Sequence, residues 1–320
     1  MDMARKSKPK RPDTQPGAAM RRGYADTRFG QVHYQEAGQG PVLVLLPAAT
    51  QAVFIFDGLM QRLSARYRVV ALDTLGSSFS APLPEGATFE TLAMSVLDSF
   101  DSLSIDRAHV YGIHTGNKIA TAFAARWPDR VGDTIICGQS HSIVPDMKAR
   151  TAQMRRVTRH NFAGDAAPDV AGLKVWADEQ KEITSLWWRP DVFGGNAASA
   201  MAEIRTQIVH RLLSFDAVAP LYEANFAYDL EADLRRLPNR TLIVEIATPI
   251  EDKDVGRQGD ALLGIVPRSS LITFEEPDGL GLTLAGRADE LAKAIDAFLI
   301  GDAEQQRAAG IRTPTNERAA

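Results

Sequence analysis

Short runs of apolar, β-branched residues alternate along the chain with longer segments in which apolar residues recur every three to four positions. The first pattern is typical of buried strands and the second of amphipathic helices. The short runs predict strands at residues 24–28, 31–36, 42–46, 68–72, 109–112, 134–137, 241–246 and 271–275. The longer segments predict helices at residues 54–65, 89–103, 115–126, 254–265 and 288–299. This alternation favours an α/β fold, with a mostly parallel sheet flanked by helices on both faces.

The alternation is interrupted between residues 143 and 237, which contain helical patterns and aromatic residues but no convincing parallel strand. We therefore predict a helical cap at residues 143–237, inserted into a core formed by residues 23–142 and 238–300. Trp187 and Trp188 are candidates to line an apolar substrate chamber between cap and core. Such aromatic residues equally suit a small core within the cap itself. The other aromatic candidates are Trp176, Phe193, Phe226 and Tyr228.

Both ends of the chain are predicted to be disordered. Residues 1–22 are basic and contain prolines, and they include no apolar stretch able to act as a secretory signal. We interpret them as a disordered cytoplasmic arm. Residues 301–320 look equally loose and are predicted to be a disordered tail.

Composition and charge narrow the classes of partner. The net charge is -4, from 36 Lys and Arg against 40 Asp and Glu, which gives no electrostatic argument for nucleic acid. No segment approaches the roughly 18 to 20 apolar residues of a membrane span. The single cysteine, Cys137, excludes an internal disulfide, and the apolar run around it predicts its burial. We expect a cytoplasmic protein with a small-molecule substrate, and the sequence leaves a homo-oligomer open.

The most informative motif is Gly-x-His-x-Gly at residues 112–116, between a predicted strand and a predicted helix. Glycines flank a residue in this way where a chain turns sharply from strand to helix, because side chains there would collide with neighbouring backbone. The arrangement is that of a nucleophile elbow with His114 in place of serine. We therefore expect His114 to project from the carboxyl edge of the sheet.

Two further segments are similar to motifs of a known superfamily. Residues 73–80 read DTLGSSFS, similar to a D-x-x-G-x-G-x-S turn with Ser78 in place of the second glycine, and residues 126–131 read RWPDRV. With the elbow, these segments make residues 23–300 similar to the α/β-hydrolase superfamily. The resemblance implies an α/β-hydrolase fold with a cap. It implies no particular reaction, because this fold hosts hydrolases, lyases and inactive relatives.

The resemblance also implies where an oxyanion would bind. The loop after the third strand reads PAAT at residues 47–50, without the His-Gly pair of many relatives. The backbone N–H of Ala48 or Ala49 is still expected to point into the site, because such a site uses main-chain donors. The second expected donor is the N–H of Thr115, directly after the elbow residue.

The resemblance places the acid of a catalytic triad after the seventh strand and its histidine after the eighth. Glu251 and Asp252 are the candidate acids, and the spacing prefers Asp252, although a carboxylate there also suits a helix cap. Leu280 stands at the expected histidine position, and no histidine follows His210. An ordinary Ser-His-Asp mechanism is therefore excluded by His114 and by Leu280.

His114 has three candidate roles. As a general base it would activate water or abstract a substrate proton, since imidazole titrates near neutral pH. As a nucleophile it would attack a carbonyl and form an acyl-imidazole that water hydrolyses. In either role Glu251 or Asp252 would hold the ring. In the third role the ring only fills a vestigial site.

Other polar groups follow the sixth strand at the same sheet edge, and they are Gln139, Ser140 and His141. Ser140 and His141 are expected to face His114 across the pocket, although a loop cap also suits Ser140. The histidines match no strong metal-ligand spacing, so we predict no metal. The chain contains neither G-x-G-x-x-G nor a Walker loop, so we predict no nucleotide cofactor.

Two hypotheses of different kinds follow. The first is an enzyme that acts on a small carbonyl-containing substrate, with His114 as general base or nucleophile. Ester or lactone hydrolysis is its default reaction, and cofactor-free lyase or decarboxylase chemistry is the close second. The second hypothesis is a catalytically inactive relative that binds a ligand or a partner, because two triad positions are lost. Turnover that disappears in His114→Ala would separate the two.

Overall fold

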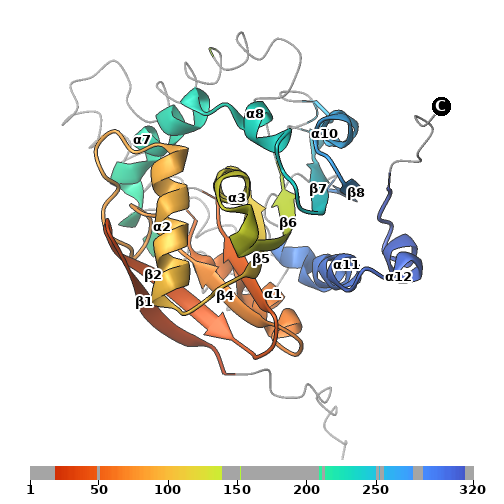
Figure 1. Ribbon diagram of the computed structural model, residues 1–320, viewed down its shortest axis with the longest axis horizontal. Helices are drawn as coiled ribbons and strands as arrows, with labels where there is room; N and C mark the ends of the chain where they lie inside the picture. Colours follow the sequence, from red (N-terminus) through yellow and green to blue (C-terminus); the bar gives the residue numbers. More distant parts are fainter. Residues whose placement is uncertain are drawn as a thin grey trace, which may run out of the picture.

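The computed structural model describes residues 19–48, 51–138, 152, 209–210, 213–249, 252, 256–276 and 284–313, without the side chains of residues 215 and 219. The strands are β1 (Arg21–Thr27), β2 (Gly30–Ala37), β3 (Val42–Leu46), β4 (Arg68–Leu72), β5 (Ala108–Ile113), β6 (Val131–Cys137), β7 (Thr241–Ala247) and β8 (Ser269–Glu275). They form one sheet in the order β1-β2-β4-β3-β5-β6-β7-β8 (Figure 1). The pairs β1–β2 and β2–β4 are antiparallel and the others are parallel. The predicted mostly parallel sheet is confirmed.

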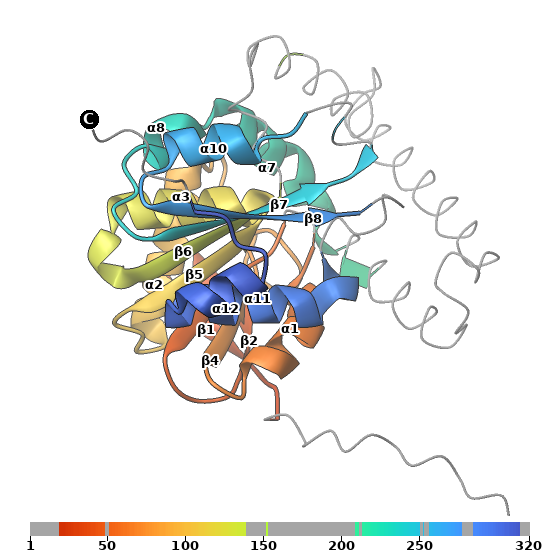
Figure 2. The ribbon, with the colours of Figure 1, turned by 90° about the vertical axis from the view of Figure 1, so that its right-hand side faces the viewer.

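Helices cover both faces of this sheet, as the sequence predicts. Figure 2 shows α8 and α10 on one side of β7 and β8, with α11 and α12 on the other. The α-helices are α1 (Asp57–Leu63), α2 (Phe89–Ser102), α3 (Thr115–Arg126), α7 (Phe215–Ala227), α8 (Leu230–Leu234), α10 (Gly259–Ile265), α11 (Ala288–Ile300) and α12 (Ala303–Ala308). Short 3-10 helices are η1 (Val53–Phe56), η2 (Pro128–Arg130) and η5 (Ala285–Arg287).

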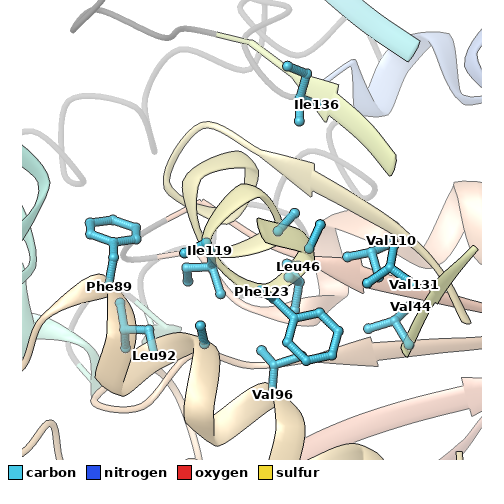
Figure 3. Packing of buried hydrophobic residues seen from close by; sticks show 14 of the residues in the cluster. Val44, Leu46, Phe89, Leu92, Val96, Val110, Ile119, Phe123, Val131 and Ile136 are labelled. Atoms are coloured by element: carbon cyan, nitrogen blue, oxygen red, sulfur yellow. The ribbon is translucent and has the colours of Figure 1, made fainter. Parts of the chain in front are cut away.

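Each face of the sheet carries its own hydrophobic cluster. Val110 packs in the cluster beneath α2 and α3, whereas its neighbour Tyr111 packs in the cluster beneath α1 and α11. Figure 3 shows Phe123 of α3 between α2 and the strands, and its ring meets that of Phe100 edge-on with centroids 4.9 Å apart. Because both faces are buried, the strands have the near-continuous apolar character that made them recognisable in the sequence.

The predicted disordered tail at residues 301–320 is wrong for residues 302–312, because contacts there outweigh the weak apolar pattern. The Asp302 carboxylate accepts hydrogen bonds from the first backbone N–H groups of α12 and so caps that helix. Ile311 is buried against the core. Arg312 then pairs with Leu271 of β8 through backbone hydrogen bonds of 2.8 and 2.7 Å. Residues 314–320 lie outside the described residues.

Two other boundaries differ from the predictions. β1 begins at Arg21, so the predicted arm over residues 1–22 is two residues too long; Arg21 faces Glu36 across the antiparallel pair. The predicted helix 254–265 begins only at Gly259 as α10. Its start is fixed by Glu245 of β7, whose carboxylate accepts from the N–H groups of Gln258 and Gly259. In both places a tertiary contact sets the boundary.

Within the predicted cap, the structure describes chiefly α7 and α8, and α8 is joined to α3 by a carboxylate. The side chain of Asp233 is 4% exposed. It accepts hydrogen bonds from the Tyr228 hydroxyl at 2.7 Å and from Arg126 at 2.8 Å, and it also pairs with Arg236. Burial alone would raise the pKa of Asp233, but these donors outweigh burial and hold the pKa below its ordinary value.

The substitution Asp233→Asn is expected to lower the free energy of unfolding by about 2 kcal/mol, because it removes the charge that three donors face. Since folding lowers the pKa of Asp233, its contribution is present above the ordinary carboxylate pKa and is lost as the pH falls through the folded value. Urea unfolding of both proteins at neutral and at acidic pH measures this difference. Glu231→Gln removes the exposed pair with Arg235 and should cost under about 0.5 kcal/mol. Equal losses in the two variants would contradict the prediction.

Candidate active site

The elbow lies where β5 ends and α3 begins, and His114 is the residue on which the chain turns. Its φ is 50° and its ψ is -108°, a backbone conformation that residues with a side chain rarely adopt. Backbone groups lie very close to the two glycines that flank His114. A Cβ at Gly112 would collide with the carbonyl oxygen of Gly116, and a Cβ at Gly116 would collide with that of Leu46. The glycine spacing that predicted an elbow therefore has the expected steric cause.

Two contacts join the elbow to the end of β6. The backbone N–H of His114 donates to the carbonyl oxygen of Cys137 at 2.9 Å. The buried side chain of Asn117 donates to the same oxygen at 2.9 Å. The imidazole of His114 lies directly beside Gly138, where an added Cβ would be 2.6 Å from the ring carbon Cε1. Gly138, with φ 72°, thus leaves room for the ring.

Sequence reasoning missed Asn117 and Gly138 as residues that position His114. The signal for Asn117 was a polar side chain in the first turn of an alanine-rich helix, three residues after the elbow. Gly138 gave no signal that distinguishes it from an ordinary glycine after a strand. Its importance depends on the distance between two adjacent strand ends, which no local pattern encodes.

The two expected oxyanion donors lie just beyond the ends of two neighbouring strands, β3 and β5. Leu46 of β3 is in register with Gly112 of β5. Ala48 lies two residues after Leu46, and His114 lies two residues after Gly112. Ala48 is buried and Thr115 is partly buried. In the part of the chain that the structure describes, no residue accepts a hydrogen bond from the N–H of either Ala48 or Thr115. Both main-chain donors are therefore available at the carboxyl edge of the sheet.

Asp252, the preferred candidate acid, pairs with an arginine. Its Oδ2 accepts from Arg257 Nε at 2.9 Å, and the same guanidinium binds both oxygens of Glu275 at 2.8 and 3.0 Å. The guanidinium lowers the pKa of the Glu275 carboxyl. Among the described contacts of Asp252 there is none with His114. The structure therefore brings Asp252 together with the end of β8 and not with the elbow.

Several predicted site residues lie outside the described residues. These are Glu251, Gln139, Ser140, His141, Trp187, Trp188 and Leu280. Among the residues that are described, no group of three or more His, Cys, Asp or Glu side chains has a metal-binding arrangement. None of the described helices combines the length and the apolar character that crossing a membrane requires.

The chain is similar to several known proteins. A family model described as "alpha/beta hydrolase fold" matches residues 41–186. A 2-hydroxy-6-oxononadienedioate/2-hydroxy-6-oxononatrienedioate hydrolase of Paraburkholderia xenovorans is 36% identical over 114 residues, 34% of this chain and 39% of that protein. Carboxylesterase YbfK of Bacillus subtilis is 25% identical over 227 residues, 64% of this chain and 74% of that protein.

A solved structure, the enol-lactonase from Burkholderia xenovorans LB400, superimposes with a TM-score of 0.62 at 22% identity, covering 87% of this chain and all of that chain. The chain therefore has the α/β-hydrolase fold. The family model and the curated relatives are similar to this chain over part of its length. The chain spans about two fifths of the length of the Paraburkholderia relative. The residues that the family model matches include the elbow.

Proposed function

We propose that this protein is a hydrolase that acts on a small carbonyl-containing molecule, with His114 as general base or nucleophile. The observation that carries the proposal is the conformation of His114. A residue with a side chain costs of order 1–3 kcal/mol in such a sparsely populated backbone region, and such residues cluster at functional sites. The curated relatives, a carboxylesterase and an oxo-acid hydrolase by name, support the substrate class.

The proposed chemistry uses the two main-chain donors beside the ring. As a base, His114 takes a proton from water, the water oxygen adds to the carbonyl carbon, and the resulting oxyanion accepts hydrogen bonds from Ala48 and Thr115. The oxyanion then collapses, the C–O bond to the alcohol breaks, and the leaving alkoxide takes the proton from His114. As a nucleophile, a ring nitrogen adds to the same carbon, the alcohol leaves, and water releases the acid from the acyl-imidazole. The same donors would stabilise an enolate, so lyase chemistry is the second reaction of this site.

A ligand-binding relative without turnover is the alternative, and the pairing of Asp252 favours it. A histidine base is ordinarily oriented by a carboxylate that fixes its tautomer. Here the described candidate carboxylate is bound by Arg257. This alternative predicts that carbonyl ligands bind to the protein without being converted.

The experiment is a turnover assay with p-nitrophenyl esters, lactones and β-keto acids, followed by intact-protein mass spectrometry. Release of product with a transient acyl adduct on His114 would select the nucleophile, and release without that adduct would select the base. Saturable binding of the same compounds without product would instead establish the ligand-binding alternative.

The substitution Gly138→Ala should lower turnover by about 10²-fold, because the added methyl group displaces the His114 ring and misplacement of a reacting group by about 1 Å has that effect. Gly86→Ala is the matched control. Gly86 also has a positive φ, 68°, but an added Cβ there meets no atom within 4 Å. Both variants place a Cβ at a position of similar positive φ. Equal activities in the two variants would show that the ring position is irrelevant.

A further inference from the structure

A serine hydroxyl and a histidine ring, the groups missing from the elbow and from the end of β8, meet elsewhere at the carboxyl edge of the sheet. Ser78 lies in the turn after β4, and its Oγ is 2.8 Å from Nδ1 of His210. Ser78 is 8% exposed and His210 is partly buried. A hydroxyl within hydrogen-bond reach of an imidazole is the arrangement of a nucleophile and its base.

The ring of His210 is fixed by aromatic contacts. Phe54 stacks on it with centroids 4.5 Å apart and planes 22° apart. Phe79 meets it edge-on at 5.7 Å. These contacts hold Nδ1 toward Ser78, and they give the surroundings of the pair an apolar, aromatic character. A group that orients the base is the third part of such an arrangement.

Burial favours the neutral form of His210. Burial lowers the pKa of His210 below its ordinary value, and the charges of His33 and Arg22 lower it further, while Asp73 acts in the opposite direction. Asp73 itself is held by His33 Nδ1 at 2.7 Å and by the N–H of Val53 at 2.8 Å. A neutral ring at neutral pH is able to accept the hydroxyl proton.

The backbone at Ser78 adopts a positive φ. Its value is 54°. The N–H of Ser78 donates to the Ser214 hydroxyl at 3.0 Å. Within the described part of the chain, no residue accepts a hydrogen bond from the next N–H, that of Phe79. A main-chain donor directly after the nucleophile is where an elbow places one half of its oxyanion site.

We propose that Ser78 and His210 form a second nucleophile and base pair, which is acylated by small aryl esters. Ser78 Oγ adds to the ester carbonyl as its proton passes to His210 Nδ1. The C–O bond to the phenol then breaks, and the phenol takes that proton. Water, deprotonated by His210, adds to the acyl-serine and releases the acid, which restores both side chains.

The test is labelling with a fluorophosphonate and with p-nitrophenyl acetate, read by peptide mass mapping. We expect the label on Ser78 in the wild type and a decrease of about 10²- to 10⁴-fold in labelling rate in His210→Phe, the range for loss of a general base. Ser78→Gly should remain folded, because glycine suits a positive φ, and should lose the label. Ser80→Ala removes a nearby hydroxyl and should keep the label on Ser78.

The pH dependence of labelling is a further test. Because the pKa of His210 is lowered, the labelling rate should fall only when the pH is brought below about 6.5, the ordinary histidine pKa.

The labelling also separates this proposal from the role of His114. A label on Ser78 that persists in His114→Ala supports the pair whatever the elbow does. Turnover that depends on His114 while Ser78 stays unlabelled overturns the pair alone. An unchanged labelling rate in His210→Phe also overturns it, because the imidazole then takes no part in the reaction of Ser78.

Discussion

Replacement of His114 by alanine is expected to lower kcat/KM for ester substrates by about 10²- to 10⁴-fold, the contribution of a general acid or base. The reason is that the ring occupies the point where the elbow presents its reacting group. The expected change in stability is small, because alanine experiences the same positive φ as histidine. His114→Gly should lose activity to the same extent and gain stability, since glycine adopts this backbone without strain. Steady-state kinetics and thermal unfolding of the three proteins measure both effects.

His109→Ala is the matched control for this prediction. His109 lies in the same strand but near its opposite end, where it contacts Asp133 at 3.3 Å. Its replacement removes an imidazole without touching the carboxyl edge of the sheet, so turnover should be retained. Retained turnover in His114→Ala as well would contradict the proposed role, and it would leave the Ser78 and His210 pair as the candidate for any hydrolysis observed.

The substitution Gly116→Ala is expected to lower the free energy of unfolding by about 3 kcal/mol or more, because the new methyl group meets backbone that cannot move aside. A Cβ at this position collides with the carbonyl oxygens of Leu46 and Pro47. The sign of this change in the free energy of unfolding is informative, because alanine in an unhindered helix position is more favourable than glycine by roughly 0.5–1 kcal/mol. Urea unfolding monitored by circular dichroism measures the difference.

Gly264→Ala in α10 provides the comparison for Gly116→Ala. A Cβ at Gly264 meets no atom within 4 Å, so this variant should be slightly more stable than the wild type. If both substitutions stabilised the protein, the close approach of α3 to β3 would not be a constraint on the elbow. If Gly116→Ala alone destabilises it, the second glycine of the motif is required by packing and not by chemistry.

Much of the fold could be predicted from the sequence because its signals are local. The strands buried on both faces are short apolar runs, and α2 and α3 follow their apolar periodicity to within a residue or two. The elbow could be predicted because its two glycines stand at fixed offsets from His114. The errors came where distant contacts decide: Glu245 sets the start of α10, and Leu271 pairs with Arg312 in the predicted tail.

For the candidate site too, some features could be predicted from the sequence and others could not. The position of His114 and the absence of a histidine after His210 follow from the sequence alone. The partner of Asp252 does not follow from the sequence. Arg257 is five residues away, but no local pattern indicates that its guanidinium binds this carboxylate. The pair of Ser78 and His210 is separated by 132 residues, so no spacing rule would have suggested it.

By itself, the sequence determined the sheet with its two helical layers and the elbow between β5 and α3. These features depend on the order of apolar and small residues along short segments. Only the tertiary structure decided that Gly138 makes room for the imidazole of His114, that Arg257 holds Asp252, and that Ser78 meets His210. Each of these depends on atoms brought within a few ångströms by the packing of separate elements, and that proximity has no counterpart in local sequence.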